Sequence, residues 1–144
     1  MTMPDPQRAR TLFAAALGRA PVPPGAWRHL LAVDVPRQRL VLLDRQGEGL
    51  AEYRVSTAVA GIGGEAGSLR TPPGLHRIRA RIGAGQPAGM VFASREPTGE
   101  VWRGAPDERD LILTRVLTLE GLEDGVNRGP GCDSLERYIY LHGT

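Results

Sequence analysis

Glycine and proline are so frequent in this chain that they limit how far any helix or strand can run. The 144 residues include 19 glycines and 12 prolines, and both interrupt regular structure, glycine through its backbone freedom and proline through its missing amide hydrogen. Such dense interruption favours many short strands joined by turns. Hydrophobic residues make up 41% and charged residues 24% of the chain, values typical of a globular protein. We therefore predict an all-β (mainly β) domain.

The N-terminus is the exception to this pattern. Residues 5–18 are predicted to form a short helix, because Asp5 can cap its start and Gly18 suits its end. Closely spaced prolines then indicate an extended linker. We divide the chain into a helix and Pro-rich linker at residues 1–26 and a strand-rich domain at residues 27–144.

Apolar runs and alternating patterns predict the strands of that domain. The predicted strands are residues 29–35, 39–43, 50–59, 75–82, 111–119 and 137–142. Short turns join the first three, which predicts an antiparallel meander. In the last strand, side chains alternate between faces, so Tyr138, Tyr140 and His142 are expected to share one face.

Charge and hydropathy exclude several classes of partner. The formal net charge is +2, and the basic residues form no run with interleaved aromatics, so we predict no nucleic-acid partner. No apolar stretch approaches the roughly 18 residues of a membrane span. Glycine-rich residues 61–67 lack the βαβ surroundings of a dinucleotide site, and the histidines show no metal-ligand spacing. We predict no cofactor and no metal, and we interpret the acidic residues within 120–133 as solvated surface.

The sequence leaves the compartment and the oligomeric state open. Cys132 is the single cysteine, so it can form no internal disulfide that would mark an oxidising compartment. Two arginines followed by the apolar residues 12–17 resemble a secretory signal only in part, because the apolar block is short and Gly18-Arg19 interrupts it.

His142 is the first candidate for chemistry, because a histidine at a strand end beside glycine lies where a substrate could reach it. Position alone fits a structural or surface histidine better, since neutral imidazole often serves as a hydrogen-bonding group. The functional interpretation therefore needs a second signal from elsewhere in the chain.

Residues 71–74, Thr-Pro-Pro-Gly, provide that signal. They resemble the threonine-proline-x-glycine segment of L,D-transpeptidases, and residues 55–57 resemble that family's valine-serine-threonine stretch. The order of elements also agrees, with residues 91–101 following the Thr-Pro-Pro-Gly segment and residues 138–144 closing the chain. Residues 28–144 thus resemble an L,D-transpeptidase catalytic domain (YkuD-type family), which implies a sandwich-like β fold.

In that family a cysteine thiolate attacks the amide carbonyl at the third residue of a peptidoglycan stem peptide, and an acceptor amine resolves the thioester. The resemblance implies His142 as the general base and Gly143 as the residue whose carbonyl orients the imidazole. It implies stem peptides as partners and the periplasm or cell envelope as the location. It also implies four substrate-binding residues, namely Thr71, Gly74, Tyr138 and Tyr140.

The resemblance ends before the family's serine-histidine-glycine-cysteine motif, which is placed roughly a dozen or more residues beyond the base. Because the sequence ends at Thr144, we expect a domain that is incomplete at its C-terminus and inactive as given. Cys132 is not expected to replace the nucleophile, because it precedes the base in a loop and Asp133 disfavours its thiolate. The alternatives are a non-catalytic stem-peptide-binding module (a pseudoenzyme) and a truncated enzyme with an open sheet edge.

Overall fold

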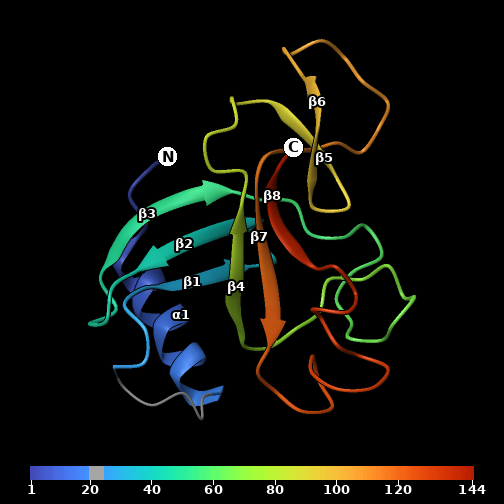
Figure 1. Cartoon of the computed structure of the whole chain (residues 1–144). Coiled ribbons are helices and arrows are strands. Elements are labelled where there is room, and N and C mark those ends of the chain that lie inside the picture. Colours follow the sequence, from blue (N-terminus) through green and yellow to red (C-terminus); the bar gives the residue numbers. More distant parts are fainter. Residues whose placement is uncertain (20–24) are drawn as a thin grey trace. The chain divides into compact units, whose positions relative to one another are not determined.

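The computed structural model describes residues 1–19 and 25–144, and the chain is mainly β, as predicted (Figure 1). It divides into two compact units, Met1–Ile62 with Leu69–Thr71 and Gly63–Ser68 with Pro72–Thr144. Each unit holds one antiparallel sheet. The elements are α1 (Pro6–Arg19), β1 (Leu30–Asp34), β2 (Arg39–Leu43), β3 (Gly49–Arg54), β4 (His76–Ile82), β5 (Met90–Ala93), β6 (Glu96–Val101), β7 (Ile112–Gly121) and β8 (Tyr140–Gly143). The predicted linker lies mostly outside the described residues.

The first unit is a three-stranded meander in the order β1-β2-β3, which confirms the predicted antiparallel arrangement. The predicted helix is also confirmed, and Asp5 Oδ1 accepts a hydrogen bond from the Arg8 amide at 2.8 Å, as a capping residue should. Ala9 of α1 is buried against Val41 and Leu43 of β2. The helix is therefore part of this unit's hydrophobic core.

The second unit has a five-stranded sheet in the order β4-β7-β5-β6, with β8 also paired to β7 (Figure 1). The ten-residue β7 is long enough to pair antiparallel with β4, β5 and β8. The core of the second unit consists of Met90, Phe92 and Val116, and Tyr140 packs against them. β8 is thereby fixed between hydrogen bonds to β7 and an apolar contact with the core.

One predicted strand boundary is wrong because a side chain binds the backbone beyond the observed end of the strand. The strand predicted at 50–59 ends at Arg54, and the amide of Thr57 instead donates to Gln38 Oε1 at 2.8 Å. Residues 91–101, which were expected to follow the Thr-Pro-Pro-Gly segment, lie in a hairpin of β5 and β6. Ser94 and Arg95 form its turn with φ values of 48° and 69°.

The closing strand is also shorter than predicted. It begins at Tyr140, and Tyr138 adopts φ of 57°, so Tyr138 does not share a strand face with Tyr140 and His142. Backbone hydrogen bonds explain the difference, because the amides of Arg137 and Ile139 donate to the carbonyls of Asp133 and Ser134, at 2.9 and 3.1 Å. These bonds hold a turn where the alternating sequence predicted a strand.

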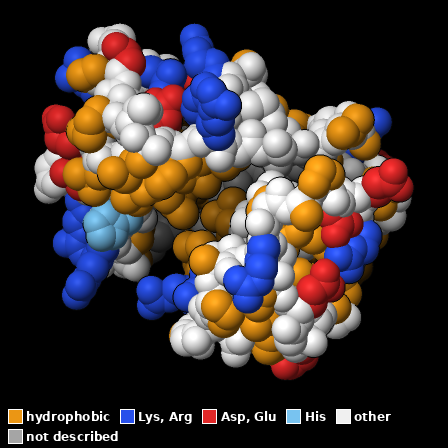
Figure 2. All heavy atoms as spheres, turned by 90° about the horizontal axis from the view of Figure 1, so that it is seen from above, with side chains coloured by type: hydrophobic (Ala, Val, Ile, Leu, Met, Phe, Trp, Pro, Cys, Tyr) orange, Lys and Arg blue, Asp and Glu red, His pale blue; other side chains and the backbone are white. Residues whose placement is uncertain are grey.

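The surface combines charged and apolar side chains. On the face seen in Figure 2, acidic and basic side chains are interspersed with hydrophobic ones. Within the described residues, no helix is long and apolar enough to cross a membrane. The absence of a nucleic-acid partner stays a prediction.

Candidate functional site

The end of β8 carries the candidate base. In the register with β7, His142 lies opposite Val116 and Tyr140 lies opposite Thr118. Directly paired residues of antiparallel strands point to the same side, so these four side chains share one face of the sheet. Val116 and Thr118 are buried whereas His142 is exposed. His142 is thus the exposed residue at the end of the face whose other residues pack into the core.

The backbone of Gly143 fixes the tautomer of His142. The Nδ1 atom of His142 lies 2.8 Å from the carbonyl oxygen of Gly143. A carbonyl oxygen only accepts hydrogen bonds, so the neutral imidazole carries its proton on Nδ1 and leaves Nε2 with a free lone pair. Across residues 1–19 and 25–144, Nε2 of His142 has no hydrogen-bond partner. The arrangement can accept a proton from an incoming group.

His76 has the same tautomer but a different environment. Its Nδ1 lies 3.0 Å from the carbonyl oxygen of Gly74, and its Nε2 lies 2.7 Å from Ser134 Oγ. The Ser134 hydroxyl therefore donates to Nε2. The pair has the connectivity of a serine nucleophile and its base, yet Ser134 is 0% exposed. No substrate reaches that hydroxyl, so His76 is structural and His142 is the histidine with a usable nitrogen.

Burial lowers the pKa of His76 below its ordinary value, although the Gly74 carbonyl and the Glu123 carboxylate oppose the shift. The unfolded chain therefore binds the proton first as the pH falls. The contribution of neutral His76 to the free energy of unfolding is fully present above the pKa of the unfolded chain, about 6.5. It is lost as the pH falls from there through the lower pKa of the folded state.

We expect the free energy of unfolding of the wild type to fall across this pH window, and His76→Gln to lose that part of the dependence. Urea denaturation between pH 8 and pH 5 measures it. His142→Gln is the matched control, because His142 is exposed and should leave the profile unchanged. An identical pH profile in His76→Gln and the wild type would contradict the assignment.

The Thr-Pro-Pro-Gly segment is an anchoring segment in the structure. Thr71 Oγ1 accepts the amide of Ala58 at 2.9 Å, and its own amide donates to the carbonyl of Gly61 at 3.0 Å. Thr71 thus holds residues 58–61, where the glycine-rich turn begins, within the first unit. Gly74 lies in the second unit with φ of 91°. Sequence reasoning predicted both residues as substrate-binding, and the structure gives each of them a role in fixing the backbone.

Asn127 holds the backbone on both sides of Gly74. The Asn127 side chain is 0% exposed, and its Nδ2 donates to the carbonyls of Pro73 and Leu75, both at 2.9 Å. Its Oδ1 accepts the amide of Glu123 at 2.9 Å. The Glu123 carboxylate in turn accepts the amide of Leu75 at 2.5 Å. The bonds to Pro73 and Leu75 hold the loop after β7 against the start of β4, and the bond between Asn127 and Glu123 holds that loop together.

Tyr138 and Tyr140 meet at one arginine that sequence reasoning did not single out. Arg95 Nε donates to the Tyr140 hydroxyl at 2.8 Å. Its guanidinium carbon also lies 4.6 Å from the centre of the Tyr138 ring and 5.8 Å from that of Tyr140. The two predicted tyrosines are therefore brought together, although from a turn and a strand.

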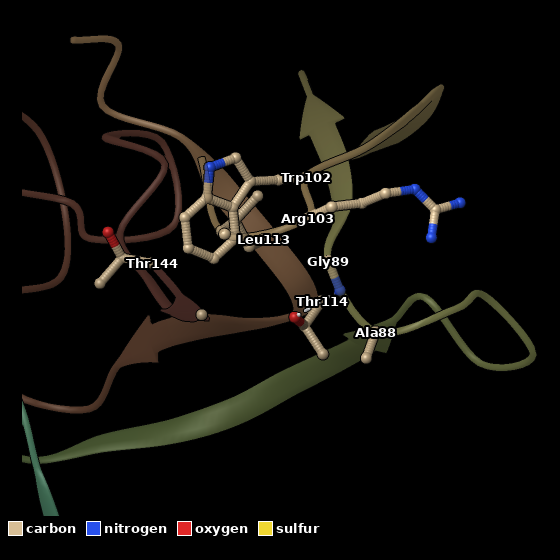
Figure 3. Close-up of a pocket in the computed structure, with 9 residues that line it drawn as sticks. Ala88, Gly89, Trp102, Arg103, Leu113, Thr114 and Thr144 are labelled. Carbon is tan, nitrogen blue, oxygen red and sulfur yellow. Dashed lines mark hydrogen bonds between the residues drawn. The ribbon is translucent and has the colours of Figure 1, made fainter. Parts of the chain in front are cut away.

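A pocket of about 320 Å³ opens beside the end of β8 (Figure 3). Gly143 forms part of its wall, and His142 precedes that glycine without lining the pocket. In Figure 3 the Trp102 ring lies beside Leu113, whereas the Arg103 side chain points away from it. The lining residues are Ala88, Gly89, Trp102, Arg103, Gly104, Leu113, Thr114, Gly143 and Thr144.

Sequence reasoning missed Arg95, Trp102, Asn127 and Ser134. None of them carries a motif, and Asn127 and Ser134 lie in a glycine-rich stretch interpreted as an ordinary loop. Arg95, Asn127 and Ser134 each have at least one hydrogen-bond partner 45 or more positions away. No group of three or more acidic, histidine or cysteine side chains in the described part of the chain could hold a metal ion.

The fold and the site define a mainly β domain that presents a histidine of fixed tautomer at a strand end next to a pocket. The family model for the L,D-transpeptidase catalytic domain (YkuD) matches residues 28–144. The chain therefore belongs to the L,D-transpeptidase catalytic-domain family. Comparison with curated proteins and with solved structures gave no match.

Proposed function

We propose that this domain binds peptidoglycan stem peptides in the manner of its family, with His142 as the general base and Gly143 as its orienting residue. The observation that carries the proposal is the free Nε2 of His142, since the Gly143 carbonyl holds the proton on Nδ1. His76, the other histidine of the second unit, has its Nε2 occupied by Ser134. The family match supplies the substrate class.

In the family's acyl transfer, a histidine base moves a proton in each half of the reaction. With a cysteine supplied from outside residues 1–144, Nε2 of His142 would take the thiol proton, and the thiolate would form a bond to the carbonyl carbon of the stem peptide. The amide C–N bond would then break as the imidazolium returns the proton to the leaving amine. In the second half, Nε2 would deprotonate the acceptor amine that displaces the thioester sulfur.

Cys132 is not the nucleophile in this proposal. Its thiol donates to the carbonyl oxygens of Arg128 at 3.4 Å and Gly129 at 3.6 Å, so the sulfur is engaged within its own turn. We propose that residues 1–144 bind stem peptides without cleaving them, which is the binding-module alternative.

Histidine modification by diethyl pyrocarbonate tests the binding site. We expect a stem tetrapeptide to slow the modification of His142 at least several-fold, because the bound peptide would cover Nε2. His29 is exposed and serves as the internal control, so its modification rate should not change. Peptide mapping by mass spectrometry measures both rates in one sample.

The intact mass of the protein and the amount of free D-alanine, measured on the same sample, distinguish peptide binding from acyl transfer. A bound peptide with no acyl adduct on the protein and no release of D-alanine supports the binding module. An adduct that Cys132→Ser abolishes would show that Cys132 is a nucleophile after all. If His142 and His29 respond equally to the peptide, the stem-peptide site does not lie at His142.

A further inference from the structure

Arg95 occupies a turn that is unfavourable for its residue type. Ser94 and Arg95 are the two turn residues between β5 and β6, and both have positive φ. Two consecutive residues of this kind normally favour glycine, asparagine or aspartate, because a larger side chain crowds the backbone. The turn therefore gains nothing from arginine, and the guanidinium must be explained by what it contacts.

The contacts of Arg95 leave its charge without a counter-ion. The side chain is half-buried between the rings of Tyr138 and Tyr140, and its polar contacts are the Tyr140 hydroxyl and, at 3.5 Å, the carbonyl of Leu135. Within the described ranges no carboxylate pairs with it. Tyrosine faces stabilise a cation only in part, and an arginine removed from solvent ordinarily has an acidic partner.

The Tyr140 hydroxyl adds a second donor at the same place. Its oxygen accepts the hydrogen bond from Arg95 Nε, and in the part of the chain that the structure describes its own proton has no acceptor. The Tyr140 O–H and those guanidinium N–H groups of Arg95 that contact neither Tyr140 nor Leu135 therefore lie side by side without an acceptor in the described ranges. A carboxylate accepts several hydrogen bonds at once, including a bidentate pair from arginine.

The exposed ring of Tyr138 packs against the face of the Arg95 guanidinium. Its ring is 64% exposed, and its backbone has the left-handed conformation that is uncommon for aromatic residues. A strained residue that holds an exposed ring against a cation is an arrangement found near functional sites. The ring leaves the guanidinium edge, where the N–H groups lie, as the surface that a ligand can meet.

We infer that Arg95 and the Tyr140 hydroxyl form a carboxylate-binding subsite that selects stem peptides by a free carboxylate near the reacting carbonyl. This inference rests on the proposed function of His142. Tyr140 and His142 share one face of β8 and are two residues apart, about 6.6 Å along the strand. An extended peptide advances about 3.3 Å per residue, so a carboxylate roughly two residues from the reacting carbonyl would reach the subsite.

Binding of a stem tetrapeptide with free carboxylates, and of its fully amidated counterpart, tests the subsite. We expect amidation to weaken binding to the wild type about tenfold or more, as expected when a charge-assisted hydrogen bond is lost. Arg95→Gln should bind the free peptide as weakly as the wild type binds the amide, with no further loss on amidation. Tyr140→Phe should lose part of the difference, and Arg95→Lys should retain part of it.

Arg81→Gln is the matched control. Arg81 is exposed on β4 and lies opposite Leu117, on the other face of the sheet from Tyr140 and His142. The substitution Arg81→Gln removes the same charge as Arg95→Gln and should leave the binding of both peptides unchanged. Circular dichroism of each variant identifies any that fail to fold, and Arg95→Lys and Tyr140→Phe then carry the comparison.

The NMR signal of Arg95 Nε–H separates failure of the subsite from failure of the proposed function. N-acetyl-D-alanine should shift that signal, and its amide should not. If the wild type binds no stem peptide but the signal shifts, the proposed function fails and an anion site remains. If free and amidated peptides bind equally and Arg95→Gln matches the wild type, the subsite is excluded while the proposed function stands.

Discussion

Replacing Asn127 with alanine is expected to destabilise the protein by about 3–5 kcal/mol. The substitution leaves the carbonyls of Pro73 and Leu75 and the amide of Glu123 without their side-chain partner. Each buried polar group that loses its partner costs about 1–3 kcal/mol, and the Asn127 side chain is fully buried, so water does not replace it. Urea denaturation followed by circular dichroism measures the loss.

The neighbouring Asp124 provides the control for this substitution. Its carboxylate pairs at the surface with Arg128, at 2.6 Å, and an exposed pair of this kind contributes little to stability. We expect Asp124→Ala to leave the free energy of unfolding nearly unchanged. If Asn127→Ala is no more destabilising than Asp124→Ala, the buried network does not hold this loop.

Replacing Gly74 with alanine is expected to destabilise the protein by about 3–5 kcal/mol as well. With φ of 91°, Gly74 has a backbone conformation that costs an L-residue about 1–2 kcal/mol. The added methyl group would also overlap Glu123 Oε2 and lie 2.9 Å from Asn127 Nδ2. The network must then open to admit it, which adds the cost of at least one lost buried hydrogen bond. Thermal and urea denaturation both report this loss.

Gly67→Ala separates the strain from the overlap. Gly67 has φ of 77°, and a methyl group there meets no atom within 4 Å, so we expect a loss of only about 1–2 kcal/mol. In the background of Glu123→Ala, Gly74→Ala should cost less than in the wild type, because the two residues interact. Equal losses at Gly67 and Gly74 would show that backbone strain alone sets the effect.

The Thr-Pro-Pro-Gly segment has a structural role in addition to the substrate-binding role predicted for it. Its resemblance to the family motif led to the prediction that Thr71 and Gly74 bind substrate. In the structure, Thr71 holds the glycine-rich turn and Gly74 allows the close approach of Glu123 and Asn127. A loss of stem-peptide binding in Gly74→Ala would therefore follow from a displaced backbone, and the denaturation experiments identify that cause.

The parts of the fold that sequence predicted well are those fixed by neighbouring residues. The helix at α1 has its capping aspartate and its apolar residues within one segment, and β2 begins and ends where its apolar run does. The wrong boundaries have partners elsewhere. Gln38 ends β3 by binding Thr57, 19 positions away. Local pattern carries no information about such a contact.

Sequence by itself determined that the chain is mainly β, that it belongs with L,D-transpeptidases and that His142 is followed by a glycine. These depend on glycine and proline spacing, on local alternation and on short motifs. Only the tertiary structure decided which histidine has a free nitrogen and which arginine meets the tyrosines. Hydrogen bonds such as His76 to Ser134 and Arg95 to Tyr140 join residues 58 and 45 positions apart, and chain folding alone brings those groups within bonding distance.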